Sequence, residues 1–452
     1  MNRIILSTLF ILTGSTILFA QENNTISLSL RQCVQIAVEE NINITTARID
    51  KEKNQYKKAE AISAIIPKIN IGANFQDNLM LPTTMLPGEI IGQPGTTIPV
   101  KMGSNFVTSA SVSLNWILYN QTTITAIQLA KKVMDFNDLS IEKISEELAV
   151  EVAKLYFLTV TTSQQKNLVE ENIIRTKRIQ DITKIMVDNG MGKQVDYDRV
   201  SINLENLYTQ LSNIEAGLEQ QHNLIKYMLN MPLHTTLVLT DSSEMQLLHN
   251  LFDDQVDFSN HIDIRMLESQ QTLNRMNRKI INSGYIPSLA FTGQFAFQGM
   301  RQEFKNYFNY SLENLWTNSS YIALSLSIPV FDGLEKRAKY RQTKMDYLKT
   351  EALLYDKKEK FTIDYQNAIN NYRNNKTNVV RQQQNIALAE RVYDETALRY
   401  REGLATMSSL LQDEMSLSSA QANYLTALYN YKEAEIRIMG LNGEIKQLII
   451  NN

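Results

Sequence analysis

The sequence predicts a mainly α-helical protein with a membrane β-barrel part, built from an internally duplicated unit of helix, β-hairpin, long helix and shorter helix. Three observations predict this fold class. Leu334–Glu402 contains neither glycine nor proline and predicts one helix roughly 100 Å long, several times an ordinary globular helix. Gln121–Asn189 is a second stretch of this kind, and each stretch follows two segments with alternating apolar and polar residues. Because two such helices do not fold around one compact core, we expect an elongated molecule.

The composition is that of a folded protein with few turns. Of the 452 residues, 43% are hydrophobic and 21% are charged, whereas only 16 are glycine and 8 are proline, fewer than a loop-rich enzyme carries. The net charge of −3 gives nucleic-acid binding no electrostatic support. After the N-terminal segment, no apolar run reaches the length of about 18 residues that a transmembrane helix needs.

Residues 1–20 predict a secretory signal peptide. Arg3 supplies the charged start, Ile4–Phe19 the apolar run, and Ala20 the small residue before the cut. The only cysteine, Cys33, lies among apolar residues of a predicted helix, so we expect it to be buried. One cysteine permits no internal disulfide, and because no cysteine follows the cut, no lipid anchor is expected there.

Residues 21–231 form the first predicted structural repeat. Its elements are a helix from about Thr25 to Ile66, strands at about 67–80 and 104–119 separated by a loop over Met80–Gly103, a long helix over 120–189 and a helix over 193–231. Pro67 ends the first helix, and the period then changes from that of a helix to that of a two-faced strand. A stripe at spacings of three and four in the long helix suits packing on neighbouring helices: Ile141, Ile144, Leu148, Val152, Leu155 and Leu158.

Residues 232–260 predict an irregular equatorial linker with a short β-like run at Leu237–Leu239, and the same pattern then repeats over 261–440. The elements of this second repeat are a helix from about Ile262 to Ser283, strands at about 285–299 and 320–332, a long helix over 333–402 and a helix over 404–439, followed by a tail over 441–452. The duplication favours one repeated unit over several unrelated domains.

The four strands are best explained as part of a membrane barrel. A sheet in lipid must close, since an unpaired edge leaves backbone groups unsatisfied, and four strands are too few to enclose a pore. Several chains must therefore combine, with the small polar face toward a wet lumen and the aromatic segment Phe304–Trp316 contributing to an interfacial girdle. The helices carry charge throughout, so we expect them to project into the periplasm as a tube.

Five segments carry a resemblance to a known family: Ala64–Ile69, Gly284–Leu289, Leu324–Gly333, Tyr400–Thr406 and His261–Ile264. The first two resemble the helix-to-strand junctions of the TolC-like outer-membrane efflux proteins. The third resembles their strand-to-helix signature, and the fourth their helix-turn tip. The fifth resembles the opening of their second repeat, although the family usually has Arg-Pro there. The likeness covers the whole mature chain, and it is the order and spacing of the motifs that carry it.

The resemblance implies a homotrimeric channel-tunnel, with a twelve-strand barrel in the outer membrane, four strands per chain, and a long twelve-helix periplasmic extension. It implies coupling through a periplasmic adaptor (membrane fusion) protein to an inner-membrane pump or ABC transporter, in a tripartite efflux or type I secretion system. Export of drugs, other small molecules or proteins would be passive, without covalent chemistry, and the sequence leaves the cargo open.

The resemblance also indicates candidate site residues. The turns fall where the family's adaptor-docking tips lie: Asn189, Gly190, Met191, Glu402, Gly403 and Leu404. A plain helix–helix turn, in which glycine supplies a positive φ, explains the same residues, and the two interpretations are compatible.

The family's periplasmic gate corresponds to a second set: Asp196, Tyr400, Ser409, Gln412 and Asp413. Asp196 and Tyr400 match an aspartate–tyrosine link, and an ordinary surface pair is the alternative. Ala405 replaces the arginine of a second link, so that link cannot form. The acidic ring of some members corresponds to the uncharged Ser409 and Gln412, with Asp413 one residue away.

Two other function classes were weighed. A periplasmic coiled-coil adaptor or structural spacer explains the helices but gives the strands and the duplication no role. An exported enzyme using carboxylates, such as a glycosidase, needs a compact cleft that these helices do not provide. The four histidines lie at no metal-binding spacing, and nucleotide-binding and catalytic-triad motifs are missing from the sequence. We therefore expect no catalytic residue, metal or cofactor.

Overall fold

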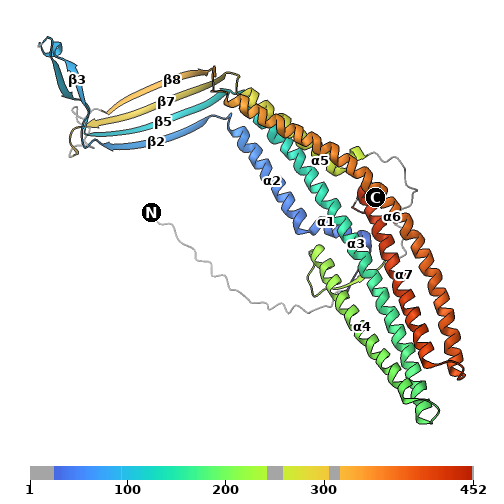
Figure 1. Cartoon of the computed structure of the whole chain (residues 1–452). Coiled ribbons are helices and arrows are strands. Elements are labelled where there is room, and N and C mark those ends of the chain that lie inside the picture. Colours follow the sequence, from blue (N-terminus) through green and yellow to red (C-terminus); the bar gives the residue numbers. More distant parts are fainter. Residues whose placement is uncertain (1–24, 93, 242–257, 305–315, 450–452) are drawn as a thin grey trace, which may run out of the picture. The chain divides into compact units, whose positions relative to one another are not determined.

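A computed structural model describes residues 25–92, 94–241, 258–304 and 316–449 (Figure 1). The chain forms two compact units, each assembled from segments far apart in the sequence. The sheet unit comprises Asn43–Ser145 and Asp254–Tyr365; the turn unit comprises the described parts of Met1–Ile42, Glu146–Asp253 and Gln366–Asn452. The predicted signal peptide, residues 242–257 of the predicted linker and the last three residues of the tail lie outside the described residues.

Two helices contribute to both units, and they coincide with the two breaker-free stretches. Helix α3 (Gln121–Asp188) has 68 residues and α6 (Glu335–Arg401) has 67. Of the predicted apolar stripe on α3, three members are buried and the others are half-buried: the buried ones are Leu148, Val152 and Leu155. The prediction of a mainly helical chain with a small sheet part is confirmed.

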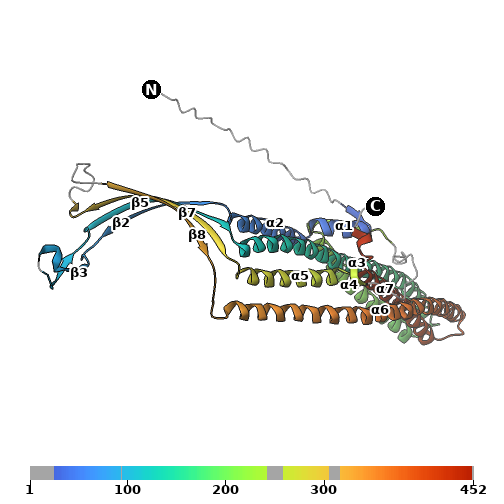
Figure 2. The same cartoon turned by 90° about the horizontal axis from the view of Figure 1, so that it is seen from above.

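The sheet unit contains a four-stranded antiparallel sheet in the order β2-β5-β7-β8, whose strands lie side by side in Figures 1 and 2. Its elements in chain order are α2 (Ile42–Ser63), β2 (Lys68–Asp77), β3 (Thr83–Pro87), the 3₁₀ turn η1 (Gly88–Ile91), β4 (Thr97–Lys101), β5 (Phe106–Tyr119), the 3₁₀ turn η2 (Phe258–Asn260), α5 (Ile262–Ser283), β7 (Ser288–Arg301) and β8 (Trp316–Ser327). The centre of the sheet is thus the pair β5–β7, one strand from each predicted repeat, and β2 and β8 are its edges.

An ion-pair network fixes the start of α5. The carboxylate of Asp263 accepts from Lys143 of α3 at 2.7 Å and lies 2.8 Å from the ammonium of Lys357 on α6. Burial raises the pKa of Asp263, but the hydrogen bonds and charges of the two lysines outweigh it, so the pKa lies below its ordinary value. Asp263 therefore stays ionised and holds the three helices together.

The turn unit contains the second half of α3 and of α6 with six further elements. These are β1 (Thr25–Leu28), α1 (Leu30–Glu40), α4 (Gln194–Met228), β6 (Thr236–Leu239), α7 (Met407–Asn442) and α8 (Lys446–Ile449). One buried apolar cluster joins α3 to α4 and consists of Val169, Ile173, Leu204, Leu207, Ile214 and Leu218. A second joins all four long helices and consists of Ile179, Val200, Tyr393, Met407, Leu410 and Leu417. Such stripes at helical spacing give the unit its core.

The N-terminal segment differs from the continuous helix predicted over Thr25–Ile66. Residues 25–28 form strand β1, which pairs in parallel with β6. Ser29 then starts α1 through a capping box with Gln32. Asn41 interrupts the helix: its backbone is extended, and its buried side-chain amide donates to the carbonyl of Met228 at 2.9 Å. The helical period continued across both breaks, which is why the sequence pattern alone did not show them.

The segment predicted as a loop over Met80–Gly103 contains a hairpin, β3 paired with β4. Two of the four prolines of this segment, Pro87 and Pro99, lie in the strands of the hairpin, where a missing N–H group is tolerated because each strand is an edge. Proline and glycine density therefore misled the prediction here.

Strand β8 runs over Trp316–Ser327 and not over the predicted 320–332. Pro329 cannot donate to a ladder, and Asp332 caps the following helix instead. Its carboxylate accepts from the backbone N–H groups of Leu334 and Lys336, each at 3.1 Å. The residues after Ser327 thus start a helix and do not extend a strand.

Candidate functional site

The first turn, Asn189–Lys193, joins α3 to α4 in the turn unit. Gly190 has φ +73°, a left-handed conformation that side chains disfavour. Behind it, the N–H groups of Met191 and Gly192 both donate to the carbonyl of Met186, which closes the helix end. Met191 leaves 77% of its surface exposed. The turn therefore presents an apolar side chain on a rigid backbone.

The second turn, Glu402–Thr406, joins α6 to α7 and is built in the same way. Gly403 has φ +78°, and the N–H of Leu404 donates to the carbonyl of Arg399 at 2.8 Å. Leu404 is 75% exposed. Thr406 caps α7 by accepting from the N–H of Ser409 at 3.1 Å. Each turn thus ends a long helix with a left-handed glycine followed by an exposed apolar residue.

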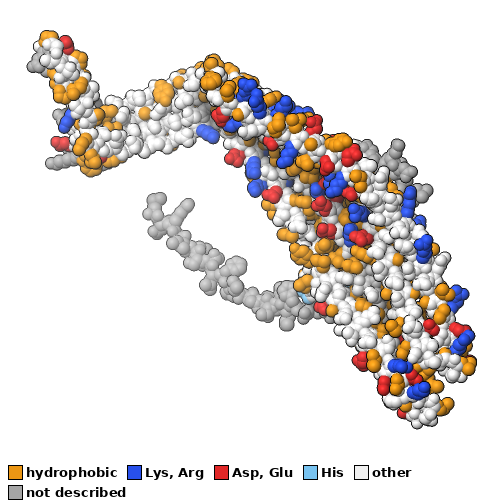
Figure 3. Space-filling model, in the orientation of Figure 1, with side chains coloured by type: hydrophobic (Ala, Val, Ile, Leu, Met, Phe, Trp, Pro, Cys, Tyr) orange, Lys and Arg blue, Asp and Glu red, His pale blue; other side chains and the backbone are white. Residues whose placement is uncertain are grey.

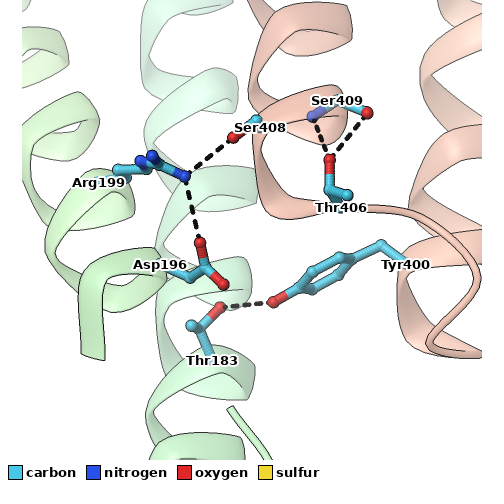
Figure 4. Close-up of polar contacts among 7 residues, drawn as sticks. All are labelled: Thr183, Asp196, Arg199, Tyr400, Thr406, Ser408 and Ser409. Atoms are coloured by element: carbon cyan, nitrogen blue, oxygen red, sulfur yellow. Dashed lines mark hydrogen bonds and ion pairs between the residues drawn. The ribbon is translucent and has the colours of Figure 1, made fainter. Parts of the chain in front are cut away.

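The structure brings the two turns to the same end of the turn unit (Figure 4). The guanidinium of Arg199 on α4 donates to the hydroxyl of Ser408 on α7 at 2.9 Å. Between α6 and α3, the hydroxyl of Tyr400 lies 3.5 Å from the hydroxyl of Thr183, and the Thr183 hydroxyl donates to the carbonyl of Ile179. Tyr400 must therefore be the donor to Thr183. These contacts join the α3–α4 pair to the α6–α7 pair.

Asp196 and Tyr400 lie at this end of the unit, each with a partner of its own. The Asp196 carboxylate lies 3.4 Å from Arg199 on its own helix, and Tyr400 contacts Thr183. Among the described residues no hydrogen bond joins Asp196 to Tyr400 directly. Arg199 therefore connects the aspartate to α7, where the family resemblance suggested a tyrosine partner.

The other gate candidates all lie near the start of α7, where they form no acidic cluster. Ser409 belongs to the Thr406 cap, Gln412 is exposed, and Asp413 is half-buried. Sequence reasoning missed their neighbour Glu414, which is only 3% exposed. Its spacing gives the signal: Glu414 falls on the buried stripe that contains Met407, Leu410 and Leu417.

Glu414 links three helices. The hydroxyl of Thr176 on α3 donates to one carboxylate oxygen, and the amide of Asn203 on α4 donates to the other at 3.4 Å. Burial raises the pKa of Glu414 above its ordinary value, although the Thr176 hydrogen bond and the nearby charge of Arg175 oppose the shift. A polar group thus occupies a core position beneath the turns.

In the sheet unit, the ladder register aligns most of the large apolar residues of the four strands on one face. Ile69 of β2 is opposite Leu114 of β5, which is opposite Gly293 of β7, which is opposite Ile322 of β8. The next row of the ladder lies on the other face of the sheet and is polar. It consists of Asn70, Ser113, Gln294 and Tyr321. A slip of one residue in any pair would have mixed the two faces.

The apolar face has little cover from the rest of the described chain. Ile71 is 80% exposed and Ile322 is 78% exposed. On the side visible in Figure 3, charged side chains gather over the helices and are sparse over the sheet. At one end of the sheet, the rings of Phe75, Phe106 and Phe304 cluster with centroids 5.5 to 6.2 Å apart. The apolar face therefore suits contact with hydrocarbon better than contact with water.

None of the described helices combines the length and apolar character needed to cross a membrane.

Taken together, the long paired helices with glycine turns and the sheet with one apolar and one polar face define the class of outer-membrane channel proteins. A family model described as outer membrane efflux protein matches residues 33–230 and 258–444. The chain belongs to this outer membrane efflux protein family, and the resemblance stated from the sequence is confirmed.

Solved structures of outer-membrane channels share the fold at low sequence identity. The outer membrane protein VceC from Vibrio cholerae has a TM-score of 0.70 and 12% identity, over 92% of this chain and 96% of its own. The Campylobacter jejuni CmeC channel has a TM-score of 0.70 and 15% identity, over 93% and 86%. The open state of the Neisseria gonorrhoeae MtrE channel has a TM-score of 0.71 and 17% identity, over 92% and 88%. No curated protein matches the chain significantly.

The protein is accordingly an outer-membrane efflux exit duct, with a long periplasmic extension. The members of its family are passive channels that form homotrimers and work with adaptors and inner-membrane pumps.

Proposed function

We propose that three copies of this chain form one passive duct, whose β2–β5–β7–β8 sheets join into a single barrel. The observation that carries the proposal is the register of this sheet, which has one apolar face and, among the described strands, two edges without a partner, β2 and β8. An open sheet edge is not viable in hydrocarbon. If β8 of one copy pairs with β2 of the next, three copies of a four-stranded sheet close into twelve strands with the polar face inside.

The barrel is tested by placing one charge on each face of β2. Ile71→Arg puts a guanidinium on the apolar face, where a cation near the middle of the bilayer costs about 2–4 kcal/mol. Asn70→Arg puts the same group on the polar face and is the matched control. We expect Ile71→Arg to reduce assembled protein in the outer-membrane fraction and Asn70→Arg to leave it unchanged. Equal assembly of the two variants would exclude a lipid-facing apolar side.

We further propose that the two turns dock a periplasmic adaptor, which couples the duct to an inner-membrane pump or ABC transporter of a tripartite efflux or type I secretion system. The support is the paired presentation of Met191 and Leu404, both exposed apolar side chains on turns with left-handed glycines. A surface of this kind, rimmed by polar residues, is typical of a protein interaction site.

Docking is tested with Gly190→Leu and Gly403→Leu, both of which force a side chain into a left-handed position. The control is Gly217→Leu in α4, where an added side chain meets open space and φ is ordinary. We expect the two turn variants to abolish export while the assembled protein persists, and the control to export normally. Normal export by the turn variants would rule docking out.

The periplasmic gate is the third part of the proposal. Tyr400 makes one contact between the two helix pairs, and Asp196 pairs with Arg199, which makes another, so removal of both side chains should loosen the closed end. In planar bilayers, Asp196→Ala combined with Tyr400→Phe should raise the single-channel conductance. Asp198→Ala is the control, since it removes a carboxylate whose partner, Gln194, makes no described contact with α6 or α7. Unchanged conductance in the double variant would contradict the gate.

A further inference from the structure

A cavity of about 230 Å³ lies between α3 and α6 in the turn unit, next to Tyr400. Its polar lining consists of Arg175 and Arg178 from α3 and Tyr393, Asp394, Tyr400 and Arg401 from α6. Three guanidinium groups thus oppose one carboxylate, which leaves an excess of two positive charges. In an aqueous setting this lining favours an anion.

The three guanidinium groups have few partners in the part of the chain that the structure describes. Arg401 donates its Nε to the carbonyl of Ala397 of its own helix, and Arg175 donates to the side-chain oxygen of Asn172. Arg178 has neither a hydrogen bond nor an ion pair to any described residue. No carboxylate oxygen of the described chain lies within 4 Å of the three groups, Asp394 included. Their donor capacity is largely unused, although the arginine fork matches oxyanions well.

One donor of the set is also buried. The Nε–H of Arg175 is shielded from solvent and has no hydrogen-bond partner, a rare condition because buried donors normally have an acceptor. The guanidinium lies over the Tyr393 ring, with Cζ 5.7 Å from the centroid. The buried carboxylate of Glu414 interacts electrostatically with Arg175, but its oxygens accept hydrogen bonds from Thr176 and Asn203 and not from Arg175. An acceptor within the cavity would satisfy this N–H group.

The size of the cavity narrows the class of ligand. Drug-sized ligands occupy pockets of about 300–1,000 Å³, so the space suits an ion of a few heavy atoms better than an amphiphilic drug or a peptide segment. We propose that the cavity is a binding site for a small multivalent oxyanion, held by Arg175, Arg178 and Arg401. Phosphates and polycarboxylates share this chemistry, since both carry several negatively charged acceptor oxygens.

The bound anion would bridge two helix pairs, because Arg175 and Arg178 belong to α3 whereas Arg401 belongs to α6. It would lie beside the Thr183–Tyr400 contact and strengthen the same junction. The binding site stands independently of the duct's function, while this bridging effect rests on the proposed gate.

The site is tested by isothermal titration of the full-length protein, assembled in detergent, with inorganic phosphate and separately with citrate at constant ionic strength. We expect saturable binding of one anion per chain, and the relative affinities show which oxyanion class the site prefers. Arg178→Gln and Arg401→Gln should each weaken binding about tenfold or more, the loss of a charge-assisted contact. Arg399→Gln is the matched control, since that arginine lies two residues from Arg401 and pairs with Glu395.

Absence of saturable binding by both anions, or equal weakening by Arg399→Gln, would overturn the site. Because Arg178 is exposed, its substitution leaves the core intact, and size-exclusion chromatography verifies assembly of every variant. In planar bilayers, saturating anion should lower the open probability of the wild type but not of Arg401→Gln. Binding without this difference would overturn the bridging step alone.

Discussion

The buried carboxylate of Glu414 is predicted to hold α7 to α3 and α4, so its removal should loosen the turn unit locally. In Glu414→Ala, the hydroxyl of Thr176 and the amide of Asn203 both lose their acceptor. Asn203 is partly exposed and recruits water, whereas Thr176 is fully buried. A buried donor without a partner costs about 1–3 kcal/mol. The cost lies at the lower end of this range if the hydroxyl of Thr176 rotates and donates to a carbonyl of its own helix, as the hydroxyl of Thr183 does.

Hydrogen exchange measured by mass spectrometry on the assembled protein at pH 7 is the assay. A loss of about 1–3 kcal/mol in local stability corresponds to about 5- to 150-fold faster exchange of the amides of α7 between Met407 and Leu417. The control is Asp413→Ala, which removes the adjacent carboxylate without breaking a contact that the structure describes. Exchange in Glu414→Ala that is no faster than in Asp413→Ala would refute the reasoning.

The same residue predicts a pH dependence. Burial raises the pKa of Glu414 in the folded state, so the folded protein binds this proton more tightly than the unfolded chain. The stability that Glu414 contributes is therefore full below the unfolded value of about 4.3 and falls as the pH rises through the folded pKa. After correction for intrinsic rates, exchange in α7 should accelerate as the pH rises above the unfolded pKa of about 4.3 in the wild type, and less so in Glu414→Gln. An equal slope in both would contradict the assignment.

Three further predictions follow from single residues. Asp263→Asn should lower stability at pH 7 by about 1–2 kcal/mol. Because the folded pKa of Asp263 is depressed, the wild type keeps this margin above the unfolded pKa of about 3.9 and loses it as the pH falls through the folded pKa. The melting temperatures of the two proteins, measured at one scan rate, should therefore approach each other on acidification. Gly190→Val should melt at a lower temperature than Gly190→Asn, since asparagine tolerates the left-handed region, and identical melting would contradict the φ argument. Cys33 is fully buried and its pKa is raised to about 12, so maleimide at pH 8 should label it only after denaturation, as read from the intact mass.

The faces of the sheet were predictable because the side-chain period of a strand is exact. Ile69, Leu114 and Ile322 are apolar members of three alternating segments, and the register places them in one row. The same alternation predicts that Leu118 continues the apolar side of its strand. The register shifts between Ile117 and Tyr119, however, and the shift sets Tyr119 opposite Leu289. A bulge adds one residue without a mark in composition, so alternation alone does not reveal it.

The candidate site likewise has parts that were predictable from the sequence and parts that were not. The turns at Gly190 and Gly403 were predictable, since each follows a long stretch with neither glycine nor proline. The roles proposed for the residues around them stay predictions. The partners of Asp196 and Tyr400 were not predictable, because Arg199 and Thr183 reach them only through the packing of one helix pair on the other. The Arg175 cavity has no sequence pattern of its own. The spacing of Glu414 from Met407 and Leu410 indicates its burial, but not its contacts with Thr176 and Asn203.

The two kinds of contact in the turn unit have different physical consequences. Contacts within the α3–α4 pair include an exclusively apolar cluster, among them Val169 and Leu207. Between the α3–α4 pair and the α6–α7 pair, polar contacts such as that of Thr176 with Glu414 lie beside the apolar cluster that includes Ile179 and Met407. Separating apolar surfaces exposes them to water at a cost proportional to area, whereas separated polar groups regain hydrogen bonds from water. The polar part of the junction between the pairs therefore costs less free energy to separate than the apolar cluster at the same junction.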